Sequence, residues 1–157
     1  MKTQAYWFRR KAIARAVIFF FVAVCWAMAA QLAAADQTEA DRAAVLAANS
    51  EFYRAFRESD MAAMVDIWGK VEPIIVEHPS SWREEGRAKV LSSWAVIMRS
   101  PPTIYCQVED LFIANGLATV YCLEQLNPGE VRMVNRFHQE DGVWRLIFHG
   151  PAEDHLT

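Results

Sequence analysis

The residues best placed to do chemistry follow one short apolar run. Residues 73–76, with the sequence PIIV, are predicted to form a strand that brings Glu77 and His78 to its end. Pro79 then ends the strand, because proline has no N–H to donate to a neighbouring strand. An imidazole with a pKa near neutrality can accept a proton, so His78 is the candidate general base. The alternative is that His78 only closes the loop by hydrogen bonding.

Two further polar residues lie on segments that are otherwise apolar. Asn135 alternates with Val131, Met133 and Phe137, so a strand would place all four on one face. Burying a polar side chain without a partner costs on the order of 1–3 kcal/mol, so Asn135 is expected to contact a ligand or a neighbouring side chain. His149, near the end of the last predicted strand, could reach the same region. The hairpin registers decide which of these residues face inward.

The cysteines Cys106 and Cys122 lie on neighbouring strands of one predicted hairpin. A three-residue loop at 113–115 would place them opposite each other, where a disulfide can form. A two-residue turn at 115–116 would instead pair Cys106 with Gln125 and hinder the bridge. Both a disulfide and two reduced thiols remain open.

The sequence does not predict a metal site or a bound cofactor. The four histidines have no paired spacing such as His-x-x-x-His, so only the fold could gather them. There is also no phosphate-binding loop, no nucleophile elbow and no Cys-x-x-Cys pair.

Residues 1–35 have the composition of a hydrophobic leader helix that directs export. Five basic residues and no acid are found there, the apolar run 16–24 follows the basic end, and small residues suited to cleavage stand at 27–29 and 33–35. The alternative is an uncleaved anchor over residues 16–35, which is long enough to cross a bilayer. The domain is then 36–157, in the periplasm or secreted, or held outside the cytoplasm at the inner membrane.

The domain that remains after the leader is acidic. Its 11 basic and 19 acidic residues give a net charge of −8. A surface of that sign argues against binding nucleic acid or an anionic membrane. Membrane contact is therefore expected only through residues 16–35.

Apolar residues at helical spacing predict three helices, at residues 38–58, 61–68 and 87–99. Thr38 is expected to cap the first of them, and a polar loop is predicted between Pro79 and Gly86.

After Pro102 the pattern changes to a period of two. It predicts a four-stranded antiparallel meander at residues 103–113, 117–126, 130–139 and 143–149. Helices gathered on one face of such a sheet make an α+β domain.

These residues, in this order, resemble a known family. The resemblance rests on Phe52-Tyr53, Ser59-Asp60-Met61, Ile67-Trp68, His78-Pro79, Glu85-Gly86-Arg87, Ser93-Trp94, Asn135-Arg136-Phe137, Trp144-Arg145-Leu146 and His149. The chain is similar to the SnoaL-like branch of the nuclear transport factor 2-like (NTF2-like) superfamily over residues 40–152. The resemblance implies a cone, in which a strongly curved, mostly antiparallel sheet wraps three helices around a pocket. It also implies a homodimer formed through the outer face of the sheet.

The resemblance places His78 where the ketosteroid isomerases of the superfamily carry their aspartate base. It also places Phe52 where they carry a tyrosine, with Tyr53 one position away, and Met133 where they carry a protonated acid. Without donors aimed at a developing oxyanion, steroid isomerisation is not expected.

The leading functional hypothesis is therefore that the pocket binds a small, largely apolar organic molecule. Its expected lining is aromatic, with Trp68 and Trp94, and its polar points are His78, Tyr53, Asn135 and His149. One alternative is an isomerase, cyclase or hydrolase that uses His78 as base. Another is a dimeric interaction module whose cone is filled by its own aromatic side chains.

Overall fold

The computed structural model describes residues 28, 31, 34–79, 82–126 and 128–152, and the chain divides into two units, residues 1–40 and 41–157. In the first unit, the described residues are helical and exposed. Thr38 donates its hydroxyl to the carbonyl of Ala34 at 2.9 Å, inside that helical stretch. The prediction that Thr38 caps the start of a helix is wrong, since residues 34–37 are already helical. The leader of residues 1–35 lies almost entirely outside the described residues.

The second unit is the α+β domain. Its first helix covers residues 41–58 of this unit. The other helices and the strands are α2 (Met61–Ile67), β1 (Ile75–His78), β2 (Trp82–Glu85), α3 (Arg87–Ile97), β3 (Tyr105–Ala114), β4 (Leu117–Leu126), β5 (Gly129–Glu140) and β6 (Val143–Pro151). Among the described residues, no helix is both long and apolar enough to cross a bilayer.

The two short helices begin at residues suited to that place. Asp60 caps α2, because its carboxylate accepts the backbone N–H of Ala63 at 3.0 Å. Gly86 precedes α3 with φ at +91°, a conformation that other residues rarely adopt. The Gly86 N–H donates to the carbonyl of Ile74, which ties the start of α3 to the residue before β1.

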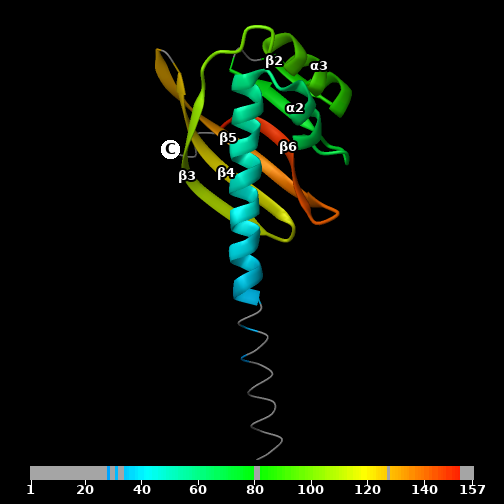
Figure 1. Ribbon diagram of the computed structural model, residues 1–157, viewed down its shortest axis with the longest axis vertical. Coiled ribbons are helices and arrows are strands. Elements are labelled where there is room, and N and C mark those ends of the chain that lie inside the picture. The colour runs from blue at the N-terminus through cyan, green and yellow to red at the C-terminus, as the bar shows by residue number, and fades with distance from the viewer. Residues whose placement is uncertain (1–27, 29–30, 32–33, 80–81, 127, 153–157) are drawn as a thin grey trace, which may run out of the picture. The chain divides into compact units, whose positions relative to one another are not determined.

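Six strands form one mixed sheet in the order β2-β1-β6-β5-β4-β3. All neighbours are antiparallel except β1 and β6, which are parallel and place Val76 beside His149. The sheet curls around the helices (Figure 1), with α2 and α3 near the end that carries β1 and β2. The predicted cone and the four-stranded meander are therefore confirmed.

The segment after Pro79 differs from the prediction. The expected polar loop contains β2, which pairs antiparallel with β1 so that His78 lies opposite Trp82. Three of the four residues of β2 are exposed, because it is an edge strand. A polar edge strand has no apolar alternation, so the pattern of the sequence could not reveal it.

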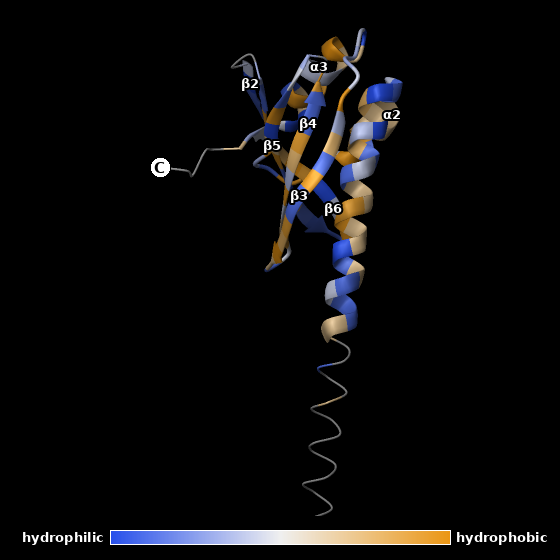
Figure 2. Cartoon of the chain, turned by 90° about the vertical axis from the view of Figure 1, so that its left-hand side faces the viewer, coloured by the Kyte–Doolittle hydropathy of each residue, from blue (hydrophilic) through white to orange (hydrophobic). Residues whose placement is uncertain are grey.

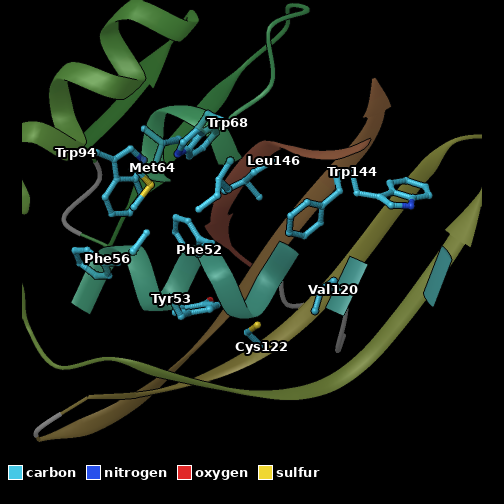
Figure 3. Packing of buried hydrophobic residues seen from close by; sticks show 14 of the residues in the cluster. Phe52, Tyr53, Phe56, Met64, Trp68, Trp94, Val120, Cys122, Trp144 and Leu146 are labelled. Carbon is cyan, nitrogen blue, oxygen red and sulfur yellow. The ribbon is translucent and has the colours of Figure 1, made fainter. Parts of the chain in front are cut away.

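The core lies between the helices and the concave face of the sheet. Its largest fully buried side chains come from the first helix, α2, α3 and the sheet, and include Phe52, Met64, Trp68, Trp94 and Leu146. Figure 3 shows these side chains converging from the helices and β6 on one another. Figure 2 shows apolar and polar residues mixed along the first helix, as expected for a helix with one buried side.

A bulge in β3 decides which face Cys106 occupies. The turn has two residues, with Ala114 opposite Leu117, but a β-bulge between Val108 and Asp110 shifts the register by one. Cys106 therefore lies opposite Glu124 and not opposite Gln125, so it shares the concave face with Cys122. The two cysteines form a disulfide with a Cα–Cα distance of 5.2 Å. The prediction that a two-residue turn pairs Cys106 with Gln125 is wrong because of this extra residue.

Deleting Glu109, the residue inside the bulge, should prevent the disulfide. Without the extra residue Cys106 would face away from Cys122, since a one-residue shift reverses the faces of a strand. The full-length variant, unfolded without reductant, should then contain two more titratable thiols than the native protein. The matched control is Glu109→Ala, which keeps the bulge and loses only the surface contact with Arg132. Equal thiol counts in the native and deleted chains would contradict this account of the bulge.

Candidate functional site

A cavity of about 410 Å³ opens between the first helix, α3 and the concave face of the sheet. Its wall is mainly aromatic and aliphatic: Phe52, Tyr53, Phe56, His78, Pro79, Trp82, Trp94, Ile97, Pro102, Ile104, Glu124, Leu126 and His149. The ionisable side chains among them are Tyr53, His78, Glu124 and His149. Such a volume and lining are typical of a site for a small organic molecule.

His78 stands at the end of β1 and is 6% exposed. Its Nε2 lies 3.1 Å from the hydroxyl of Ser93 on α3, and that hydroxyl donates to the carbonyl of Val90 at 2.8 Å. Because a serine has one hydroxyl proton, this arrangement makes Nε2 the donor and leaves Nδ1 with its lone pair. Burial lowers the pKa of His78, and the carboxylate of Glu84 opposes part of that shift. His78 is therefore a neutral imidazole that can accept a proton.

Glu124 on β4 is the one acid among the described residues that line the cavity. Its Oε1 accepts the hydroxyl of Tyr53 at 2.6 Å, and its side chain is 3% exposed. Burial raises the pKa of Glu124 from 4.5 to about 7, although the hydrogen bond from Tyr53 lowers it. The carboxyl group therefore changes protonation at neutral pH. Burial also raises the pKa of Tyr53, followed by the effect of the Glu124 charge, so Tyr53 remains a donor.

Asn135 lies behind the cavity wall and forms hydrogen bonds with Tyr53 and His149, two residues of that wall. Its Nδ2 donates to Asn49 Oδ1 at 2.7 Å and to the hydroxyl of Tyr53 at 3.2 Å. Its Oδ1 lies 2.7 Å from Nδ1 of His149. An amide oxygen can only accept, so the His149 proton is on Nδ1 and the lone pair is on Nε2. Asn135 thereby sets the orientation of both Tyr53 and His149.

His149 Nε2 and Glu124 Oε1 lie 4.0 Å apart, too far for a hydrogen bond. Burial, followed by the effect of the nearby His78, lowers the pKa of His149 to about 3. His149 is therefore neutral at physiological pH. Its free lone pair and the Glu124 carboxylate are two acceptors close together in the cavity wall.

Trp94 joins the two histidines through aromatic contacts. Its ring centroid lies 5.1 Å from that of His78 and 5.6 Å from that of His149. Trp68 packs behind Trp94, with a centroid distance of 6.4 Å (Figure 3). The indole N–H groups of both tryptophans have no acceptor among the described residues.

The structure brings most of the expected site residues together. His78, Tyr53, Trp94 and His149 line the cavity. Trp68 and Asn135 do not line it, and they act on it only through the residues they contact. Phe52 and Tyr53 both face the cavity, although they are neighbours on one helix.

Glu124 is a residue of the cavity wall that the sequence analysis does not predict. The sequence signal was present, because Glu124 continues the buried series Ala118, Val120 and Cys122 at a spacing of two. A lone acid in register with apolar residues is a candidate for burial. The family resemblance would place an acid at Met133, which lies on β5 and is fully buried. The acid in this cavity comes instead from the neighbouring strand β4.

In the described part of the chain, no three His, Cys, Asp or Glu side chains gather closely enough to hold a metal ion. The residues that line the cavity offer hydrogen bonding and proton transfer, by one acid and two neutral imidazoles.

Residues 45–150 match the family of SnoaL-like domains. Solved structures with the same fold include a putative dehydratase of the NTF2-like family from Streptomyces avermitilis, with 24% identity, a TM-score of 0.59, and 74% of this chain and 99% of that chain covered. An NTF2-like protein of unknown function from Shewanella oneidensis has 11% identity, a TM-score of 0.61, and coverage of 72% and 99%.

A putative calcium/calmodulin-dependent protein kinase type II association domain from Thiobacillus denitrificans has 20% identity, a TM-score of 0.61, and coverage of 68% and 94%. At these identities the likeness shows a shared fold and not a shared activity. No curated protein matches the chain.

The protonation of Glu124 should appear in the stability of the protein. Its raised pKa means that the folded state binds the proton more tightly than the unfolded state, so stability falls as pH rises from about 4.5 to about 7. The lowered pKa of His149 has the opposite sign and adds stability as pH rises from about 3 to 6.5. Glu124→Gln removes only the first effect.

We therefore expect the stability of Glu124→Gln, relative to the native protein, to increase by roughly 2–3 kcal/mol between pH 5 and pH 8. Urea unfolding at several pH values measures this difference. Glu85→Gln, at an exposed carboxylate of β2, is the matched control and should leave the difference constant. A relative stability of Glu124→Gln that is the same at both pH values would contradict the burial of an ionisable Glu124.

Proposed function

The chain belongs to the family of SnoaL-like domains, and from that premise we propose that it binds a small, largely apolar organic molecule in the cavity of its cone. The resemblance seen in the sequence is thereby confirmed. The observation that carries the proposal is the cavity of about 410 Å³, in which an aromatic wall surrounds a few polar groups. Burial of an apolar ligand against such a wall contributes about 25 cal/mol for each Å² removed from water.

The cavity also bears on the alternative of a pure interaction module. That hypothesis requires a cone filled by its own aromatic side chains. Phe52, Phe56 and Trp94 instead form a wall beside an unfilled volume. Ligand binding accounts for this volume, whereas a module that acts only through its surface does not need it.

Filling the cavity should abolish binding. The native protein is screened for thermal stabilisation by uncharged and charged ring compounds, and a compound at about 100 times its dissociation constant should stabilise it by about 2.7 kcal/mol. Leu126→Trp introduces a large side chain at the cavity wall and should remove the stabilisation. Leu117→Trp, the same substitution at an exposed position of the same strand, should retain it. Equal stabilisation of both variants would place the bound compound outside the cavity.

A second candidate function, turnover with His78 as general base, is favoured by the state of that imidazole. It lines the cavity, is neutral, and is oriented by Ser93, as a base near a bound substrate must be. Isomerase, cyclase or hydrolase chemistry would use this arrangement. Steroid isomerisation is not proposed, because Phe52 and Met133 stand where the isomerases carry their oxyanion donors.

If a compound found by the screen is consumed, His78→Ala should lower the rate by roughly 100-fold or more, since general base catalysis contributes that much. Trp68→Phe keeps an aromatic ring behind the wall and should change the rate only slightly. Turnover measured by chromatography over pH 5–9 makes the comparison. A rate that is unchanged in His78→Ala would exclude His78 as the base.

We also propose that the domain is exported and works as a homodimer. The composition of residues 1–35 supports export by a cleaved signal or an anchor. The disulfide between Cys106 and Cys122 supports an oxidising compartment such as the periplasm. The homodimer rests on the family resemblance alone.

A further inference from the structure

One end of the cavity presents hydrogen-bond acceptors to a ligand. Glu124 Oε1 and His149 Nε2 are 4.0 Å apart, and no proton is shared between them at that distance. The proton of His149 is committed to Asn135 through Nδ1, so Nε2 can only accept. While Glu124 is ionised, a ligand group that enters this end of the cavity must therefore supply the hydrogens.

The polar network behind the wall favours negative charge on Glu124. Asn135 Nδ2 donates to the hydroxyl of Tyr53, and that hydroxyl donates to Glu124 Oε1 at 2.6 Å. Both hydrogen bonds run towards the carboxylate, and donors to the charged form stabilise it. Burial without a cation opposes this charge. The carboxylate is thus prepared for a positive partner that the described part of the protein does not supply.

The rest of the lining agrees with a cation as that partner. No lysine or arginine is found among the described residues that line the cavity. Five aromatic residues are found there: Phe52, Tyr53, Phe56, Trp82 and Trp94. Aromatic rings attract cations through their negative faces, by about 0.5–2 kcal/mol, and they also pack well against an apolar body.

We propose that the cavity binds an organic ammonium ion, an amine with an apolar ring-containing body, whose nitrogen donates to both Glu124 and His149. A protonated amine offers up to three N–H donors and no acceptor, which fits two acceptors at one place. The ammonium also neutralises the buried carboxylate, because buried charges are stable when paired and hydrogen-bonded. The inference rests on the proposed function, since it names the class of the ligand in the same cavity.

Ligands of other charge fit less well. An organic carboxylate would face Glu124 and the lone pair of His149 and would be repelled. An alcohol can donate one hydrogen bond and so satisfies only one of the two acceptors. A ketone or ether has no hydrogen to donate, so it forms a hydrogen bond with Glu124 only when Glu124 is protonated and donates to it. The cavity should therefore rank ligands of the same size as amine, then alcohol, then carboxylate.

Three compounds with one ring system test this order: 2-(1-naphthyl)ethylamine, 2-(1-naphthyl)ethanol and 1-naphthylacetate, with the matching phenyl compounds as a smaller set. Titration calorimetry on the full-length protein at pH 8 measures their affinities. We expect the amine to bind at least about tenfold more tightly than the alcohol, which corresponds to about 1.4 kcal/mol. The carboxylate should bind more weakly than both.

Glu124→Gln should remove the advantage of the amine and leave the alcohol within about twofold of its native affinity. Glu85→Gln, at an exposed carboxylate, is the control and should keep the advantage. The advantage should also decrease from pH 8 to pH 6 as Glu124 takes up a proton. The titratable groups that face Glu124 are Tyr53 on the first helix and His149 on β6, with His78 in the same wall, and Tyr53 and His149 do not titrate in this range.

The outcomes separate this inference from the proposed function. An alcohol that binds native protein as tightly as the amine, or an advantage that survives in Glu124→Gln, would overturn the ammonium proposal and leave the cavity as a binding site for neutral molecules. The comparison of native affinities needs no variant, so poor folding of Glu124→Gln would not protect the proposal. No binding by either set, together with no stabilisation in the wider screen, would overturn both.

Discussion

The hydrogen bonds of Asn135 are the constraint on which the cavity depends. This residue has no exposed surface and lies between the buried Met133 and Phe137 on the inner face of β5, so each of its polar atoms must be paired inside the protein. Its amide nitrogen donates to Asn49 and Tyr53, and its oxygen accepts from His149. One amide thereby joins the first helix to two strands and decides which nitrogen of His149 carries the proton. Because the proton is on Nδ1, the Nε2 atom of His149 can only accept a hydrogen bond at the cavity wall.

Burying Glu124 lowers the stability of the fold but places an ionisable group where a ligand can contact it. A carboxyl group that is 3% exposed and has one hydrogen-bond donor is more stable as the neutral acid, which is why its pKa rises to about 7. A leucine at this position would pack without that cost. Because acids with shifted pKa values in cavities are often functional, we interpret Glu124 as a group that binds the ligand and not as one that stabilises the fold.

The sequence predicted the parts of the fold that have a periodic signal. Long apolar repeats identified the helices and the four strands of the meander, and the ordered residues around Trp68, Trp94 and Trp144 identified the family. The sequence did not reveal β2, because this exposed edge strand shows no apolar alternation. It also did not show that the helix containing Thr38 begins before that residue. For the site, His78 could be predicted from the apolar run 73–76 and the proline that follows His78. The geometry between His78, Glu124 and His149 could not, since it depends on registers between strands that are far apart in the sequence.

The bulge at Glu109 shows how one unpredicted residue can organise a site. A regular hairpin with the turn at Asn115-Gly116 would turn Cys106 to the outer face. With the bulge, Cys106 lies opposite Glu124 and is bonded to Cys122, which is two residues before Glu124 on the same face. The disulfide therefore spans the strand pair beside the buried acid and holds the edge strand β3 against β4 at that point. Because β3 has no further neighbour in the sheet, this covalent link limits how far the edge can separate from the residue that carries the charge.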